Sequence, residues 1–171
     1  EQRLGHGAVP EFSLTDNTLL TGDAFHRHGF VLQDKALEFT ETVIERFQVK
    51  PERPKAAAAS FSGGNLQKYI VGREILSAPS VLVVDQPTWG VDVGAATVIR
   101  NALLELCRQG AGVLVVSEEI EELFAVCDRI AVMYRGCISP TVEVSAMSTE
   151  ELGRWMAGLW DGSPFVQERG E

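Results

Sequence analysis

The stretch that decides the fold reads VLVVDQPT and occupies residues 81–88. Its first four residues are apolar, which is typical of a strand buried on both faces of a parallel sheet. Asp85 ends this strand, and the ligands of open α/β sheets bind at the carboxyl edge of the strands. An aspartate there can hold Mg²⁺ directly or through water, although Asp85 taken alone is equally suited to capping the next turn. We therefore treat Asp85 as a candidate metal ligand.

A second motif precedes this strand and reads FSGGNLQK at residues 61–68. Its serine and two glycines stand directly before a helix predicted over residues 65–77. Bare N–H groups and the positive end of the helix dipole therefore meet at one exposed point, and the glycines let the backbone approach phosphate oxygens. Taken alone, such a run is most often a plain helix cap. Its distance from Asp85, about twenty residues, favours an anion site.

Helices and strands alternate along the rest of the chain, after an irregular segment at residues 1–33. Further helices are expected at residues 34–48, 95–109, 118–127 and, after a capping box of Ser148 and Glu151, from there to about residue 159. Further strands are expected at residues 113–116 and 130–134, the second turning at Arg135 and Gly136 into a hairpin. This alternation predicts an α/β fold with parallel strands. The expected domains are a helical segment at 1–60, a core at 61–147 and a last helix with a loose tail at 148–171.

The composition fits a soluble globular protein, with 45% hydrophobic residues. The net charge of −9 argues against nonspecific binding to nucleic acid, which requires a basic surface. No stretch approaches the roughly 18 consecutive apolar residues of a membrane helix. The chain opens at Glu1 rather than at a methionine, and we interpret it as a piece of a longer protein.

The motifs resemble those of ATP-binding-cassette (ABC) ATPases over nearly the whole chain. Residues 62–65 with Gln67 and Lys68 are similar to the signature motif, residues 81–86 to the Walker B strand, and residues 89–92 to the D-loop. Residues 128–133 resemble the strand after the switch region, and residues 1–7 the segment after the Q-loop. The residues of these motifs are most similar to those in the second cassette of the tandem ATPases in simple-sugar and nucleoside importers. The resemblance implies a partial P-loop NTPase (RecA-like) parallel sheet with a mostly helical subdomain, and ATP and Mg²⁺ as cofactors.

Three departures from the family pattern stand out. No Walker A motif, Gly-x-x-x-x-Gly-Lys-Ser/Thr, occurs in the chain. Gln86 stands where active cassettes usually carry the glutamate that polarises the attacking water, and an amide cannot accept that proton. A glutamine can still orient water. Ser117 stands at the position of the switch histidine and is too short to make the same γ-phosphate contact.

The resemblance implies roles for particular residues. Ser62, Gly63, Gly64, Asn65 and Asp92 would contact a nucleotide held mainly by another cassette, Asp85 would bind the metal ion, and Gln86 and Ser117 would be degenerate catalytic positions. The chain would be part of the ATP-driven motor of a small-solute importer. Such a motor lies in the cytoplasm, on the inner face of the plasma membrane, with a membrane permease and another cassette as partners.

Further expectations follow for the isolated chain and its surfaces. Without Walker A we expect very weak ATP binding and no hydrolysis, and an uncovered sheet edge or face is expected to favour self-association. Some apolar residues are candidates for the permease-binding groove, although core packing is the commoner role for each: Phe12, Leu14, Leu19, Leu20, Phe25 and Phe30.

Two alternatives stay open at this point. One is a soluble ABC protein that acts on ribosomes or DNA without a permease, which the acidic charge and the pair Gln86 and Ser117 disfavour. The other is a non-catalytic module that binds nothing by itself.

Overall fold

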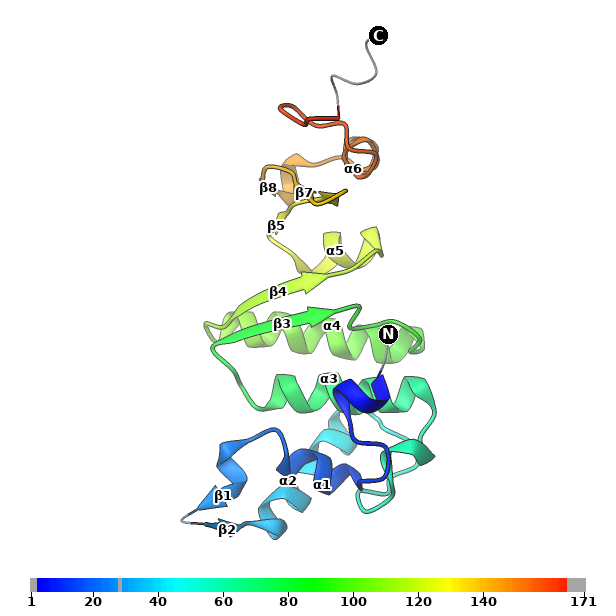
Figure 1. The fold of residues 1–171 in the computed structure, drawn as a ribbon, viewed down its shortest axis with the longest axis vertical. Helices are drawn as coiled ribbons and strands as arrows, with labels where there is room; N and C mark the ends of the chain where they lie inside the picture. Colours follow the sequence, from blue (N-terminus) through cyan, green and yellow to red (C-terminus); the bar gives the residue numbers. More distant parts are fainter. Residues whose placement is uncertain (1–2, 28, 166–171) are drawn as a thin grey trace. The chain divides into compact units, whose positions relative to one another are not determined.

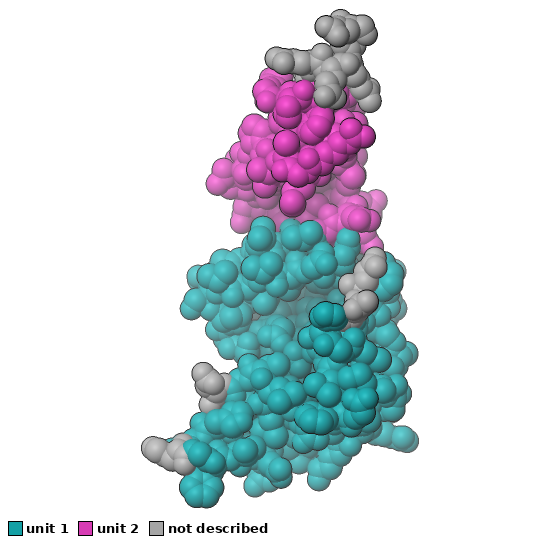
Figure 2. Space-filling model, in the orientation of Figure 1, with its two compact units in different colours: residues 1–116 teal, residues 117–171 magenta. Residues whose placement is uncertain are grey.

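The computed structural model describes residues 3–27 and 29–165, which form two compact units, residues 1–116 and 117–171 (Figure 2). The helices are α1 (Leu14–Leu19), α2 (Gln33–Arg46), α3 (Gly63–Leu76), α4 (Val93–Arg108), α5 (Ile120–Val126) and α6 (Thr149–Met156). The strands are β1 (His26–Arg27), β2 (Phe30–Val31), β3 (Val81–Asp85), β4 (Gly112–Val116), β5 (Arg129–Ile130), β6 (Met133–Tyr134), β7 (Cys137–Ile138) and β8 (Val142–Glu143). Three single helical turns, η2 (Asp23–Phe25), η3 (Ala58–Ser60) and η4 (Val144–Ala146), and a kinked segment, η1 (Arg3–Gly7), complete the order.

Strands β3 and β4 of the first unit pair in parallel, with Asp85 opposite Val116. Helix α4 runs alongside them (Figure 1), and the prediction of parallel strands joined by a helix is confirmed. Because the strands are parallel, both carboxyl ends lie at the same edge of the sheet. The polar residues that follow the two strands, Gln86 after β3 and Ser117 after β4, begin at that edge.

The prediction that β3 is buried on both faces is wrong. Leu82 and Val84 are buried in the core, but Val81 is 71% and Val83 63% exposed. On β4, Leu114 is 58% exposed. Side chains alternate between the two faces of a strand, and only one of the two faces is covered within the part of the chain that the structure describes. Burial of the second face would need another layer of structure.

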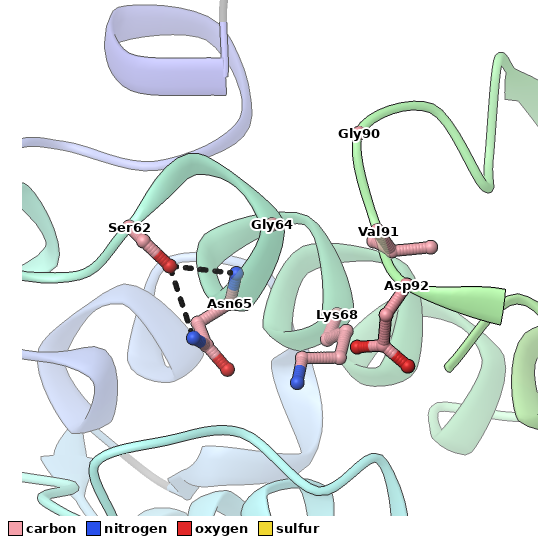
Figure 3. A pocket seen from close by; sticks show the side chains of 7 residues that line it. All are labelled: Ser62, Gly64, Asn65, Lys68, Gly90, Val91 and Asp92. Atoms are coloured by element: carbon pink, nitrogen blue, oxygen red, sulfur yellow. Dashed lines mark hydrogen bonds between the residues drawn. The ribbon is translucent and has the colours of Figure 1, made fainter. Parts of the chain in front are cut away.

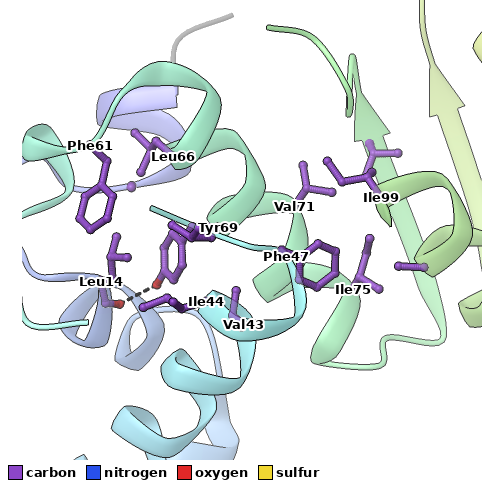
Figure 4. Close-up of a cluster of buried hydrophobic side chains, with 14 of the residues drawn as sticks. Leu14, Val43, Ile44, Phe47, Phe61, Leu66, Tyr69, Val71, Ile75 and Ile99 are labelled. Atoms are coloured by element: carbon purple, nitrogen blue, oxygen red, sulfur yellow. Dashed lines mark hydrogen bonds between the residues drawn. The ribbon is translucent and has the colours of Figure 1, made fainter. Parts of the chain in front are cut away.

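Helices α1, α2, α3 and α4 and strand β3 contribute side chains to the apolar core of the first unit (Figure 4). Leu14, Phe47 and Tyr69 are among its most deeply buried side chains. The buried Tyr69 hydroxyl donates to the Leu14 carbonyl oxygen at 2.5 Å, so its polar group is satisfied. Helix α2 lies where the sequence predicts it, and α3 begins two residues earlier than predicted.

Helix α1 lies in the segment that was predicted to be irregular. Its start carries a capping box, in which Ser13 accepts a hydrogen bond from the Asp16 amide at 3.0 Å and the Asp16 carboxylate accepts one from the Ser13 amide at 3.3 Å. The signal is present in the sequence as Ser-x-x-Asp. It is weak because the helix that follows is only six residues long.

The second unit contains two antiparallel strand pairs, β5 with β8 and β6 with β7. The prediction of one continuous strand over residues 130–134 is wrong, because it divides into β5 and β6; between them, the Val132 amide donates to the Ser139 hydroxyl at 2.9 Å. The predicted hairpin is confirmed. Arg135 and Gly136 both have positive φ, 46° and 78°, as a two-residue turn of this twist requires.

Candidate functional site

A hollow of about 350 Å³ opens at the N-terminus of α3 (Figure 3). It is lined by Ser62, Gly64, Asn65, Lys68, Gly90, Val91 and Asp92. The start of the helix forms one wall, and the loop between β3 and α4 forms the other. The hollow therefore brings together four of the residues that the sequence predicts as nucleotide contacts: Ser62, Gly64, Asn65 and Asp92. The fifth predicted contact, Gly63, lies between Ser62 and Gly64 in the chain.

Ser62 is the N-cap residue of α3 and adopts an extended backbone conformation. Its hydroxyl oxygen accepts a long hydrogen bond of 3.5 Å from the Asn65 amide and one of 3.0 Å from Asn65 Nδ2. The first N–H groups of a helix have no acceptor within the helix, and the first turn of α3 contains no acidic residue. This helix start is therefore suited to an anion.

The glycines allow the two walls to approach each other. A Cβ atom added to Gly64 would lie 2.6 Å from the Gly90 carbonyl oxygen, closer than carbon atoms approach a backbone atom. Gly90 itself has a φ of 68°, in the left-handed region that favours glycine. Both positions are therefore restricted to glycine by the geometry of the hollow.

Lys68 and Asp92 bring opposite charges to the hollow. Lys68 is only 8% exposed, and its Nζ donates to the Gln48 carbonyl oxygen at 2.8 Å. Asp92 is the N-cap of α4 and accepts a hydrogen bond from the Ala95 amide at 2.9 Å. That hydrogen bond, helped by the positive charge of Lys68, lowers the pKa of Asp92. Asp92 is therefore ionised at neutral pH.

Asp85 is exposed at the end of β3, and Gln86 continues the strand pairing by donating its amide to the Val116 carbonyl oxygen at 2.8 Å. Gln86 has a φ of 49°, unusual for a residue other than glycine. Within the described residues, no group of three or more His, Cys, Asp or Glu side chains could hold a metal ion. A single carboxylate fits Mg²⁺, which commonly takes one or two protein carboxylates and completes its shell with water and phosphate oxygens.

Ser117 belongs to the second unit. Its hydroxyl donates to Glu122 Oε2 at 2.7 Å and accepts from the Glu119 amide at 3.1 Å. Glu122 is only 2% exposed. The Ser117 side chain is thus anchored beside a buried carboxylate.

Sequence reasoning gave no role to two residues that hold the hollow together. Gln67 Nε2 donates to the carbonyl oxygens of Gln86 and Pro87, both at 3.1 Å. Arg3 contacts Gln67 and Trp89 from the first turn of the chain. The position of Gln67 in the motif was a signal for its importance, but the contacts of Arg3 join residues too far apart for a local pattern to reveal.

The apolar residues predicted for a permease groove divide between core and surface. Leu14 is fully buried in the core, so its assignment to a surface is wrong. Phe25 packs edge-on against Phe39, with ring centroids 5.4 Å apart. Leu20 and Phe30 are 60% and 74% exposed. In the described part of the chain, no helix is long and apolar enough to span a membrane.

Curated relatives are importer components. Ribose import ATP-binding protein RbsA of Streptococcus agalactiae is 39% identical over 140 residues, which cover 81% of this chain and 28% of that protein. Galactose/methyl galactoside import ATP-binding protein MglA of Mannheimia succiniciproducens is 34% identical over 154 residues, 89% of this chain and 30% of its own length. The chain thus spans less than a third of these relatives. No family model matches it.

Solved structures with the same fold are ATP-binding cassettes. The dimeric structure of MJ0796, a bacterial ABC transporter cassette, gives a TM-score of 0.70 at 17% identity, covering 82% of this chain and 61% of that one. A dimeric post-hydrolysis state of MJ0796 bound to ADP and Pi gives 0.66 at 20% identity, with the same coverage. At these identities the likeness concerns the fold alone, which confirms the predicted P-loop NTPase fold class. The similarity to sugar-import ATP-binding proteins, at 39% and 34% identity, shows that this chain belongs to the ABC ATPase family.

Proposed function

We propose that this chain is the C-terminal part of the second cassette in the ATP-binding subunit of a sugar or nucleoside importer. In this proposal, residues 62–65 bind the γ-phosphate of an ATP held by another cassette. The importer relatives favour this function over action on ribosomes or DNA. Co-purification of the complete subunit with a membrane permease is the expected result, and co-purification with ribosomes would contradict it.

The single observation that carries the proposal is the open hollow at the start of α3. Ser62 and Gly63 are exposed there, the first N–H groups of α3 have no acceptor within the helix, and Lys68 also lines the hollow. The chain has no Walker A loop to hold the other phosphates. Donors that are exposed and lack a complete site of their own fit a ligand presented by a second domain, and the solved cassette MJ0796 is a dimer.

Serine-to-alanine variants at two helix caps test this role. Ser62 and Ser148 are both N-cap serines, at α3 and α6 respectively, so Ser62→Ala and Ser148→Ala make the same chemical change. In the complete subunit with its permease, we expect Ser62→Ala to lower ATP turnover about 100-fold, the typical loss of one preorganised donor. Ser148→Ala should leave turnover unchanged. Equal turnover in the two variants would refute the proposal.

A degenerate catalytic half-site is the second part of the proposal. Asp85 would provide a ligand to Mg²⁺, while Gln86 supplies no general base and Ser117 donates its hydroxyl to Glu122. Loss of a general base typically lowers the rate by about 10²- to 10⁴-fold. We expect the double variant Gln86→Glu with Ser117→His to raise turnover in the complete subunit. Unchanged turnover would show that other groups limit this half-site.

Self-association of the isolated 171-residue chain is the third part. Val83 and Leu114 lie opposite each other on the exposed sheet face, and burial of such a face against a second copy is favourable. Val83→Glu should shift the chain toward monomer in sedimentation velocity. The matched change Val93→Glu, at a valine 82% exposed on α4, should not. A monomeric wild-type chain would contradict this part.

A further inference from the structure

Arg3 joins three segments that are distant in the sequence. Its Nε donates to Gln67 Oε1 on α3 at 2.9 Å, and its Nη2 donates to the Trp89 carbonyl oxygen at 2.6 Å. Its guanidinium carbon also lies 4.9 Å from the centroid of the Trp89 ring, within the range of a cation–π interaction. One side chain from η1 thus contacts both the helix and the loop that form the walls of the hollow.

The backbone around Arg3 is shaped to receive the guanidinium group. A Cβ atom on Gly63 would lie 2.5 Å from Arg3 Nη1, and one on Gly90 would lie 3.0 Å from Arg3 Nη2. The two glycines therefore leave the space that the guanidinium fills. Partial burial also lowers the pKa of Arg3 from its very high ordinary value.

The hydrogen bond from Arg3 and two contacts with backbone carbonyl oxygens require the same orientation of the Gln67 side-chain amide. Arginine has donors only, so the Gln67 atom that it contacts must be the oxygen. The amide nitrogen of Gln67 then faces the other way, toward the Gln86 and Pro87 carbonyl oxygens that it contacts at 3.1 Å. Arg3 and Gln67 together donate to three carbonyl oxygens of the loop after β3, those of Gln86, Pro87 and Trp89.

We propose that Arg3 is a positioning residue, which orients Gln67 and holds residues 86–92 against the start of α3. It contacts no reacting group itself. By fixing the loop it keeps Gly90 and Asp92 at the distance from Gly64 and Asn65 that defines the hollow. Its effect on ATP turnover rests on the proposed function, whereas its contacts are independent of that function.

Tryptophan quenching of the 171-residue chain tests the contacts. The chain has three tryptophans; Trp89 is 47% exposed, while Trp155 and Trp160 are buried at 9% and 5%. Arg3→Met uncovers the Trp89 ring, so we expect quenching by neutral acrylamide to increase about twofold through loss of the cation–π contact. Arg108→Met, at an arginine whose side chain is 70% exposed on α4, is the matched control and should change nothing. Unchanged quenching in Arg3→Met would overturn the inference.

Steady-state kinetics of the complete subunit with its permease test the consequence. Arg3→Met should lower kcat for ATP about tenfold with little change in KM, because misplacement of a preorganised donor weakens the transition state more than ground-state binding. Arg3→Lys keeps the charge but loses the planar fork, and should recover only part of the rate. Arg108→Met should match the wild type.

A double-variant cycle separates positioning from general destabilisation. If Arg3 acts through Gln67, then Gln67→Met lowers kcat as Arg3→Met does, and the combined variant loses little more than either single one. Additive losses would overturn the proposed route. If Ser62→Ala lowers turnover and Arg3→Met does not, the inference fails while the proposed function stands. If neither lowers turnover but quenching increases, the function fails while the contacts of Arg3 stand.

Discussion

Helices α3 and α6 both begin after an N-cap serine, yet the surroundings of the two serines differ. Ser148 accepts a 3.1 Å hydrogen bond from the Glu151 amide, and two glutamates complete the first turn of α6. Ser62 accepts a 3.5 Å bond from the Asn65 amide, and the first turn of α3 carries no acid. At α6 the helix dipole is balanced by the chain's own carboxylates. At α3 no carboxylate of the first turn balances the dipole.

The comparison shows that a helix cap does not by itself make a phosphate site. Both serines satisfy the local rule for starting a helix. At α3 a second segment, the loop with Gly90 and Asp92, approaches closely enough to form a hollow. The function that we propose therefore depends on long-range packing that is absent from the cap itself.

The largest expected effect comes from replacing a glycine of α3 by alanine, with the same replacement in α6 for comparison. Gly64→Ala places a Cβ atom 2.6 Å from the Gly90 carbonyl oxygen, so the two walls must separate. We expect a loss of about 1–3 kcal/mol in the free energy of unfolding and of about 100-fold in ATP turnover. Gly153→Ala in α6 meets no atom within 4 Å and should stabilise the chain by about 1 kcal/mol. Urea unfolding should thus give changes of opposite sign for the two variants, while the ATPase assay tests the loss expected for Gly64→Ala.

A charge change at the third residue of each helix should affect turnover next most strongly. Asn65→Asp suits a helix start electrostatically, so the fold should be kept. The added carboxylate repels phosphate, and we expect turnover in the complete subunit to fall about tenfold. Glu151→Gln removes a charge from the equivalent position of α6 and should leave turnover unchanged. Equal effects of the two variants would mean that α3 binds no anion.

The two serine caps should also differ in their contribution to stability. Ser148→Ala should lower the free energy of unfolding by about 1 kcal/mol, the usual value for a lost N-cap. Ser62→Ala should cost less, because its 3.5 Å bond to the Asn65 amide is at the limit of hydrogen-bond length. Urea denaturation followed by circular dichroism measures the free energy of unfolding of both variants. A larger loss for Ser62→Ala than for Ser148→Ala would contradict the interpretation that Ser62 contributes little to the helix cap.

The smallest expected effect is a pH dependence from Asp92 in the hollow. The Ala95 amide, followed by Lys68, lowers the pKa of Asp92 below its ordinary value of 3.8. A lowered pKa in the folded state adds stability above that ordinary value, and the gain is lost as the pH falls through the folded-state pKa. Asp92→Asn should therefore destabilise the chain more at about pH 5 than at about pH 3. An equal loss in the free energy of unfolding at both pH values would contradict the lowered pKa of Asp92.

Several parts of the fold and site could be predicted from the sequence. The apolar run of β3, the turn at Arg135 and Gly136, and the cap of Ser148 each depend on neighbouring residues, and local patterns carry that information. The break between β5 and β6 was missed because a local apolar run does not show that β5 pairs with β8 while β6 pairs with β7. The exposed face of β3 was missed because an apolar run does not show how many layers will cover it.

The sequence by itself determined that residues 62–65 begin a helix, that Asp85 ends a strand, and that their order matches the ABC family. Those properties follow from side-chain type and spacing, which act over a few residues. Only the tertiary structure decided that Gly64 lies close to Gly90 and that Arg3 donates a hydrogen bond to Gln67. Arg3 and Gln67 are 64 positions apart, and such contacts arise only when the core of α1, α2 and α3 has packed. The hollow at Ser62 is therefore a product of packing, built on a helix start that the sequence alone specifies.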